Sequence, residues 1–273
     1  MNRSVAAAFL AGHGIAREAG ELTRAALIYP LGCTALGSGA LMRVLVPDAE
    51  REGQHRTPVV LVHGFGGNPS AWFPLQQRLL RAGFAHVHAI AYNPAIRDVP
   101  AVGRHMVRSC AIVMQRSGAD HVHVVGHSLG GVVVRHAIQQ LGLAPHVRTA
   151  VTVATPHRGL TLALTSVVGL PLPGRHSRED WGQSTCRSGV RWVNFYANDD
   201  LVVRPASARA RASNGGVRNV LVPHAGHIGI LRAPAFLDGV VRELLVEEER
   251  TGLDPNRHDD GTRPKPRSLG EAS

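Results

Sequence analysis

The segment VVGHSLGGVVV, residues 124–134, places a single serine in the middle of an otherwise apolar run. Ser128 stands in the pattern G-x-S-x-G, with a glycine two residues away on each side. This pattern lets a chain pass from a strand into a helix through a turn too tight for flanking side chains, which leaves the serine oxygen exposed. Residues 121–125 predict the strand before the turn, and residues 129–143 predict the helix after it. The segment therefore indicates a sharp strand-to-helix elbow with Ser128 at its tip.

The alternation of strand and helix continues on both sides of this elbow. Apolar runs bounded by turn residues predict buried strands, and apolar residues at helical spacing predict helices. The expected strands are residues 41–46, 58–63, 86–92, 121–125, 147–155, 190–197 and 217–222, and the expected helices are 70–84, 99–115, 129–143 and 233–249. Because most of these strands read as buried on both faces, the pattern predicts an α/β fold with a doubly wound, mostly parallel sheet flanked by helices.

The chain of 273 residues is long enough for one large α/β domain, which we expect to span residues 51–249. Residues 1–50 form an N-terminal segment that leads into this domain. Its uncharged run, residues 25–42, is interpreted as a buried stretch or as a membrane-associated segment. Residues 250–273 are polar and aperiodic, and this composition predicts a disordered tail.

One connection is longer than α/β folds normally use. About 35 residues separate the strand that ends near residue 155 from the strand that begins near residue 190. An apolar half is followed by a polar half, and the insertion lies where strands emerge from the sheet. Residues 158–190 are therefore a candidate lid, and a crossover helix followed by a loop is the alternative interpretation.

The charge and aromatic content of the chain indicate which class of partner it could bind. The net charge of +10 comes almost entirely from arginine spread along the whole chain, and aromatic residues make up only 4%. This spread argues against a nucleic-acid groove and favours a solvated basic surface that could contact anionic membranes or acidic ligands.

Three cysteines without C-x-x-C spacing predict neither a zinc site nor a disulfide framework, although a single bridge stays open; they are Cys33, Cys110 and Cys186. Because no clear secretion signal begins the sequence, we expect a cytoplasmic or membrane-associated location.

A serine is a weak nucleophile unless a histidine accepts its proton and a carboxylate orients that histidine. His227 lies between the last expected strand and the last expected helix, where a loop can carry it over the strand ends. His224, three residues earlier, is the alternative. We therefore predict His227 as the general base for Ser128.

The carboxylate is expected between the serine and the histidine in chain order. Asp199 and Asp200 follow the expected strand 190–197 directly, whereas Glu179 and Asp180 lie inside the candidate lid. Asp200 precedes an apolar LVV that would pack and fix its orientation, while Asp199 could stay solvated. Asp200 is therefore preferred.

A second glycine-rich turn, HGFGG at residues 63–67, follows another expected central strand. Its main-chain N–H groups could converge on a small anion. The oxyanion that forms when Ser128 attacks an acyl carbon needs two such donors, and we expect them to be the amides of Phe65 and Leu129.

Taken together, these motifs resemble the α/β-hydrolase fold, and within it the bacterial serine lipases and carboxylesterases. The resemblance covers roughly residues 55–246. The segments that carry it are VVLVHGFGGNPSAWFPL, VHVVGHSLGGVVVRHAI, VATPHRGL, NFYANDDLVV and HAGHIGIL. We assign His157, in the third of these, no catalytic role.

Position by position, the resemblance implies Ser128 as the nucleophile, His227 as the base and Asp200 as the acid. It also implies oxyanion donors at Phe65 and Leu129. The expected function is a serine hydrolase that cleaves carboxylic, lipid-like esters through a Ser-His-Asp triad and an acyl-enzyme. Such a mechanism requires no metal and no organic cofactor, and its partner is a small-molecule ester or lipid, with contact to a membrane surface left open. The alternatives are an acyltransferase or thioesterase with the same triad, and a non-enzymatic scaffold that binds lipid or a protein.

Overall fold

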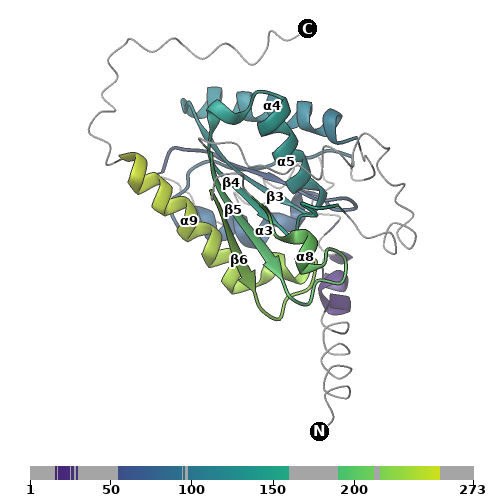
Figure 1. Cartoon of the computed structure of the whole chain (residues 1–273). Coiled ribbons are helices and arrows are strands. Elements are labelled where there is room, and N and C mark those ends of the chain that lie inside the picture. The colour runs from purple at the N-terminus through teal and green to yellow at the C-terminus, as the bar shows by residue number, and fades with distance from the viewer. Residues whose placement is uncertain are drawn as a thin grey trace.

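A computed structural model of the protein describes residues 16, 18–24, 26–27, 29, 55–93, 95, 98–159, 190–211 and 216–252. Within these residues one six-stranded sheet has the order β2-β1-β3-β4-β5-β6, and every neighbouring pair is parallel (Figure 1). Its strands are β1 (Val59–Val62), β2 (Val87–Ala89), β3 (Val122–His127), β4 (Val147–Val153), β5 (Arg191–Ala197) and β6 (Val217–Val222). The expected parallel α/β sheet is confirmed.

Helices cover both faces of the sheet, as Figure 1 shows. Helices α3 (Phe73–Arg81) and α9 (Pro234–Gly252) pack into one apolar core, and α4 (Val99–Ser117) and α5 (Leu129–Gln140) pack into the other. The shorter elements are η2 (Pro69–Trp72), η3 (Ala144–His146), α8 (Pro205–Ala208) and η4 (Gly229–Arg232), and the N-terminal residues 18–24 are also helical. No helix among these residues is long and apolar enough to cross a membrane.

The side chains of strand β1 alternate between the two apolar cores on either side of the sheet. Val59 and Leu61 belong to the core beneath α3 and α9, whereas Val60 and Val62 belong to the core beneath α4 and α5. Successive side chains of a strand point to opposite faces, so a continuous apolar run suits a strand that is covered twice. All four residues have no exposed surface.

The structure corrects several expected boundaries. The helix expected at residues 70–84 is divided into η2 and α3, since Asn68 caps η2 through a hydrogen bond from the amide of Ser70 and each element has a proline in its first two positions. The strand expected at 86–92 shrinks to the three residues of β2, which among the described residues lies at the sheet edge and pairs only with β1. The strand expected at 41–46 lies outside the described residues.

Helix α9 also runs beyond its expected end, to Gly252, so the start of the predicted tail at Arg250 is wrong. Two side chains hold this last turn in place. Arg250 forms an ion pair with Glu247 at 2.7 Å, and Thr251 accepts a hydrogen bond from Arg148 at 3.1 Å. The rest of the predicted tail, residues 253–273, lies outside the described residues.

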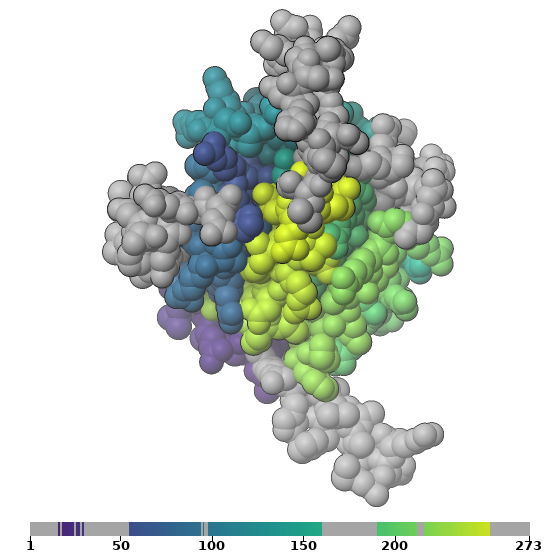
Figure 2. Space-filling model, turned by 90° about the vertical axis from the view of Figure 1, so that its left-hand side faces the viewer, coloured from purple at the N-terminus to yellow at the C-terminus, as the bar shows by residue number. Residues whose placement is uncertain are grey.

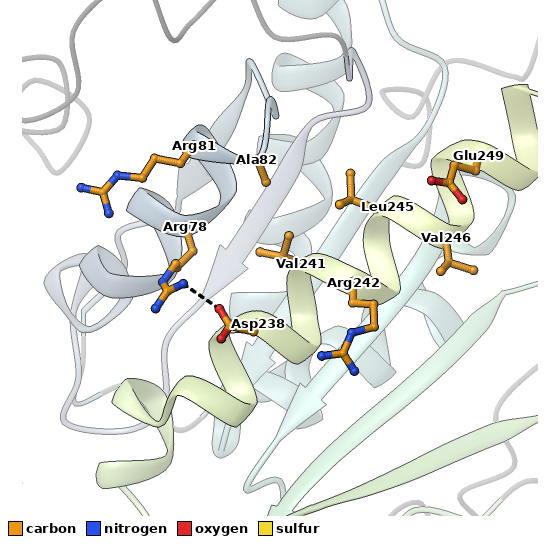
Figure 3. Close-up of a pocket in the computed structure, with 9 residues that line it drawn as sticks. All are labelled: Arg78, Arg81, Ala82, Asp238, Val241, Arg242, Leu245, Val246 and Glu249. Carbon is orange, nitrogen blue, oxygen red and sulfur yellow. Dashed lines mark hydrogen bonds and ion pairs between the residues drawn. The ribbon is translucent and has the colours of Figure 1, made fainter.

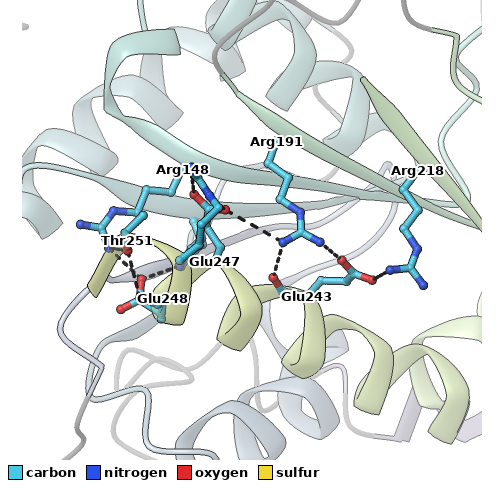
Figure 4. Close-up of polar contacts among 9 residues, drawn as sticks. Arg148, Arg191, Arg218, Glu243, Glu247, Glu248 and Thr251 are labelled. Carbon is cyan, nitrogen blue, oxygen red and sulfur yellow. Dashed lines mark hydrogen bonds and ion pairs between the residues drawn. The ribbon is translucent and has the colours of Figure 1, made fainter. Parts of the chain in front are cut away.

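Ion pairs fasten α9 to the amino ends of the central strands (Figure 4). Arg148 at the start of β4 contacts Glu248 at 2.9 Å, and Arg218 of β6 contacts Glu243 at 2.6 Å. Arg191 of β5 also pairs with Glu243. This polar network lies at the opposite end of the strands from Ser128, which follows the carboxyl end of β3.

Candidate active site

Ser128 occupies the elbow between β3 and α5 in a backbone conformation that side chains rarely adopt, with φ of 52° and ψ of −120°. Such a conformation costs roughly 1–3 kcal/mol and persists only where the surroundings enforce it. Here the amide of Ser128 donates to the carbonyl of Val153 at 2.9 Å, and its carbonyl accepts from the amide of Gly131 at 3.0 Å. The elbow predicted from G-x-S-x-G is therefore present.

Close packing of α5 explains the glycines of the motif. A Cβ atom at Gly130 would overlap the backbone carbonyls of Val62 and His63 at the end of β1. A Cβ at Gly126 would lie 2.6 Å from the carbonyl oxygen of Gly130. The helix can begin this close to two strands only because neither position carries a side chain.

The three predicted side chains form one hydrogen-bonded chain. Nδ1 of His227 lies 2.9 Å from Oδ2 of Asp200, and Nε2 of His227 lies 3.0 Å from Oγ of Ser128. A carboxylate can only accept, so a neutral His227 carries its hydrogen on Nδ1 and donates to Asp200. Nε2 is then left as an acceptor, and the Ser128 hydroxyl donates to it. Asp200 and His227 are 4% and 7% exposed, so bulk water does not compete for the bond between them.

Backbone amides distinguish the two candidate aspartates. Oδ1 of Asp200 accepts hydrogen bonds from the amides of Val202 and Val203, at 2.8 and 2.7 Å. Asp199 instead faces the alternative base His224 at 4.0 Å, and both side chains are exposed. The structure therefore brings Asp200 to His227 and leaves the alternative acid, Asp199, and the alternative base, His224, on the surface. Glu179 and Asp180 lie outside the described residues.

The two expected oxyanion donors lie on segments next to the nucleophile. Leu129 follows Ser128 and is the first residue of α5, where helix amides have no partner within the helix. Phe65 follows Gly64, at which a Cβ would lie 3.0 Å from the Cβ of Ser128. Both segments are thus close to Ser128, and the donor roles of the two amides stay predictions.

Comparison with known proteins places the chain in a family. Residues 58–207, more than half of the chain, match the family model of palmitoyl protein thioesterase. The chain belongs to this family. Two relatives, triacylglycerol lipases from Pseudarthrobacter phenanthrenivorans and Burkholderia plantarii, are each 32% identical over 117 residues, or 40% of this chain. The matches cover 35% and 32% of those lipases, so the chain spans about a third of their length.

Solved structures similar to this family member include lipases. The mature lipase BlEst2 of Bacillus licheniformis aligns with a TM-score of 0.57 and 20% identity, over 71% of this chain and 95% of that chain. Lipase B of Aspergillus fumigatus aligns with a TM-score of 0.57 and 18% identity, over 72% of this chain and 54% of that one. The expected α/β-hydrolase fold and the resemblance to lipases and esterases are confirmed.

Sequence reasoning missed a buried histidine beside the site. Nε2 of His127 lies 3.0 Å from the backbone carbonyl of His227, so the ring donates its Nε2 hydrogen to that oxygen. Burial, followed by the nearby His227, lowers the pKa of His127 to about 3, and the ring stays neutral at neutral pH. His127 directly precedes Ser128 at the end of the buried strand β3, and this position is the signal that could have identified it.

A second missed group supports the turn that follows β1. The ring of His63 stacks on Tyr92 with a centroid distance of 3.9 Å, and the Tyr92 hydroxyl donates to the carbonyl of His63. Burial lowers the pKa of His63 to about 4 and raises the pKa of Tyr92, so both side chains stay uncharged at neutral pH. This uncharged pair fixes the start of the segment that contains Phe65.

His157 belongs to a buried network under the turn after β4. Its Nε2 lies 3.0 Å from Oγ1 of Thr152, and its carbonyl accepts from Arg135 at 3.1 Å. Burial lowers the pKa of His157 to about 3. These contacts give His157 a structural role in the described turn. The candidate lid beyond it falls, for residues 160–189, outside the described residues.

Among the described residues, the candidate active site contains no metal-binding cluster and does not line the open groove of Figure 3. Among the residues that the structure describes, no group of three His, Cys, Asp or Glu side chains could hold a metal ion. The groove lies between α3 and α9, where Arg78 forms an ion pair with Asp238 at 2.8 Å, and the candidate catalytic residues do not line it. Cys110 is a free and buried thiol whose pKa burial raises to about 12; Cys33 and Cys186 lie outside the described residues.

Proposed function

We propose that this protein is a serine hydrolase that cleaves lipid-like acyl esters through a Ser-His-Asp triad and an acyl-enzyme. The observation that carries the proposal is the hydrogen-bonded chain from Asp200 through His227 to Ser128 at a strained elbow. A hydroxyl held in this way can lose its proton as it attacks, and the resulting imidazolium is stabilised by the buried carboxylate. The lipases among the relatives support an ester substrate.

In the proposed reaction, Oγ of Ser128 attacks the acyl carbon while its proton passes to Nε2 of His227. The negative charge that develops on the acyl oxygen is stabilised by the amides of Leu129 and Phe65. His227 then protonates the leaving group, and the bond from the acyl carbon to that group breaks. A water molecule, deprotonated by the same histidine, attacks the acyl-enzyme, and the free acid and Ser128 are released.

A thioesterase is the second candidate, because the family model is that of a palmitoyl protein thioesterase. The chemistry of the acyl carbon is the same, and the leaving group is a thiolate, which needs less help from a general acid than an alkoxide does. Departure of the leaving group should therefore depend more strongly on protonation by His227 in ester hydrolysis than in thioester hydrolysis.

Turnover of matched substrates tests the proposal. We would measure hydrolysis of nitrophenyl esters from short to long acyl chains, and of a thioester that carries the best of these chains. Ser128→Ala is expected to lower kcat by more than about a hundredfold on every substrate. Ser109→Ala is the matched control, because Ser109 lies on α4, where its hydroxyl donates to the carbonyl of His105 at 2.9 Å.

The relative kcat/KM values then separate the candidates. An oxygen ester that outperforms the matched thioester supports the ester hydrolase, and the reverse order supports the thioesterase. An added alcohol that captures the acyl group in place of water would instead indicate an acyltransferase. Activity in Ser128→Ala above a hundredth of the wild-type value would contradict all three.

A further inference from the structure

We propose that Glu18, from the N-terminal helical residues 18–24, is a positioning residue for His227. This inference rests on the proposed function, since it concerns the general base of that reaction. Oε1 of Glu18 accepts a hydrogen bond from the amide of Ile228 at 2.6 Å, and Oε2 accepts from the amide of Gly229 at 3.3 Å. These two amides immediately follow His227 in the chain. One carboxylate thereby holds the backbone that carries the base.

The strength of this contact follows from its charge. A hydrogen bond from a backbone amide to an ionised carboxylate is about twice as strong as a bond between neutral groups. Glu18 is half-buried, and Ile228 and Gly229 are also partly buried, so water screens the contact only in part. The loop between β6 and η4 is therefore fixed from a segment 210 residues away in the chain.

The glycines on either side of His227 provide the space that Glu18 occupies. A Cβ atom at Gly226 would overlap Oε2 of Glu18, and the other nearest atoms also belong to that side chain. A Cβ at Gly229 would lie 3.4 Å from the same oxygen. The sequence GHIG thus leaves a space that the carboxylate fills on the outer side of His227.

Two further contacts fix the N-terminal residues to the domain. Glu21 forms an ion pair with Arg232 of η4 at 3.2 Å. The carbonyl of Tyr29 accepts a hydrogen bond from Asn68 at 2.6 Å, on the segment that follows β1 and contains Phe65. The same stretch therefore touches both loops that flank Ser128. Figure 1 shows the purple N-terminal residues far from the C-terminal end of α9, and Figure 2 shows them packed against the body of the domain.

His227 is consequently held from two sides. Asp200 and His127 contact it from the interior, through its Nδ1 and its carbonyl. Glu18 holds the next two amides from the outside. A small displacement of a catalytic group lowers the rate of the chemical step more than it changes binding of the substrate. Loss of the Glu18 carboxylate should therefore lower kcat and leave KM nearly unchanged.

The first test compares Glu18→Ala and Glu18→Gln with the wild-type protein in the full chain. We expect kcat per titrated active site to fall about tenfold in Glu18→Ala, with less loss in Glu18→Gln because its amide oxygen can still accept one bond. Arg24→Gln is the control on the same helix, because Arg24 is mostly exposed and pairs only with Glu21 among the described residues. An unchanged kcat in Glu18→Ala, or an equal fall in Arg24→Gln, would overturn the inference.

A double-mutant cycle separates positioning from a general loss of stability. Gly226→Ala should lower kcat in the wild-type background, because the new methyl group displaces the Glu18 carboxylate. The same substitution should have almost no further effect in Glu18→Ala, where the overlapping atoms are gone. Additive effects of the two substitutions would contradict the proposed contact.

Hydrogen exchange keeps the inference testable even if the proposed function fails. The amides of Ile228 and Gly229 should exchange at least several-fold faster in Glu18→Ala than in the wild-type protein or in Arg24→Gln. If the wild-type protein shows no Ser128-dependent turnover, the proposed function falls, while faster exchange still supports the contact. If turnover depends on Ser128 but exchange and kcat do not depend on Glu18, the function stands and the inference falls.

Discussion

His127 donates a hydrogen bond from Nε2 to the backbone carbonyl of His227, across 3.0 Å and 100 residues of sequence. The ring of His127 is buried and the centroids of the two rings lie 4.9 Å apart. The residue before the nucleophile thus holds the main chain of the residue that is proposed to activate it. This bond couples the elbow after β3 to the loop after β6.

Replacing His127 with Phe should lower kcat for ester hydrolysis by about tenfold, because an aromatic ring is kept but the carbonyl of His227 loses its buried donor. His127→Gln keeps an N–H donor and should retain more activity. Steady-state kinetics and thermal unfolding of both variants check this. Equal kcat values in Phe and Gln variants of matched stability would show that the donor is unimportant.

Asp200→Asn should lower kcat by about 10³–10⁴ without unfolding the protein. The amide oxygen can keep the bonds from Val202 and Val203, so its NH₂ group would face Nδ1 of His227. The histidine must then carry its hydrogen on Nε2 and can no longer accept the proton of Ser128. Kinetics with Asp199→Asn as the matched control measure this effect. Similar losses in the two variants would contradict the assignment of Asp200.

Local patterns explain how much of the fold and site could be predicted. The alternation of β1 residues between two cores appears in the sequence as VVLV, and the elbow appears as G-x-S-x-G. Asp200 could be preferred over Asp199 because an apolar LVV follows it. In the structure Val203 is buried as expected but Leu201 is exposed, and the amides of Val202 and Val203 fix the carboxylate. In each case the residues that determine the structure are neighbours in the chain.

Contacts between distant residues could not be predicted in the same way. Glu18 meets the loop of His227 across 210 residues of sequence, and no residue pattern near Glu18 indicates that partner. The short length of β2 and the additional residues at the end of α9 also depend on how distant segments are arranged. Edge position limits β2, and Arg148 of β4 holds the end of α9 through an ion pair with Glu248 and a hydrogen bond to Thr251.

Gly130→Ala should destabilise the protein by about 2–4 kcal/mol and lower activity more than tenfold. The new Cβ would overlap the carbonyls of Val62 and His63, so α5 would have to move away from β1 and take Ser128 with it. Gly216→Ala is the control, because among the described residues, apart from its chain neighbours, no heavy atom lies within 4 Å of a Cβ at that position. Urea unfolding and kinetics measure the two effects. A Gly130→Ala protein as stable and active as Gly216→Ala would contradict the packing argument.

Glu248 links the stability of the fold to pH. Burial raises the pKa of its carboxyl, but hydrogen bonds from His123 and Thr57 and the nearby charges of His123 and Arg148 outweigh burial and lower it from 4.5 to about 2. The folded state thus binds this proton less tightly than the unfolded state does. A depressed carboxyl pKa stabilises the fold above pH 4.5, and this contribution is lost as the pH falls from there toward 2.

Glu248→Gln should therefore lower the free energy of unfolding by about 2 kcal/mol at pH 7, where the carboxylate is fully ionised and pairs with Arg148. Below pH 4.5 the wild-type protein gradually loses this contribution, so the difference between the two proteins should narrow as the pH approaches 2. Urea unfolding at a series of pH values measures the difference. Glu249→Gln, on the adjacent outward-facing position of α9, is the control and should follow the wild-type curve. A constant difference between Glu248→Gln and wild type across this range would mean that the carboxylate contributes through packing, and that its ionisation does not stabilise the fold.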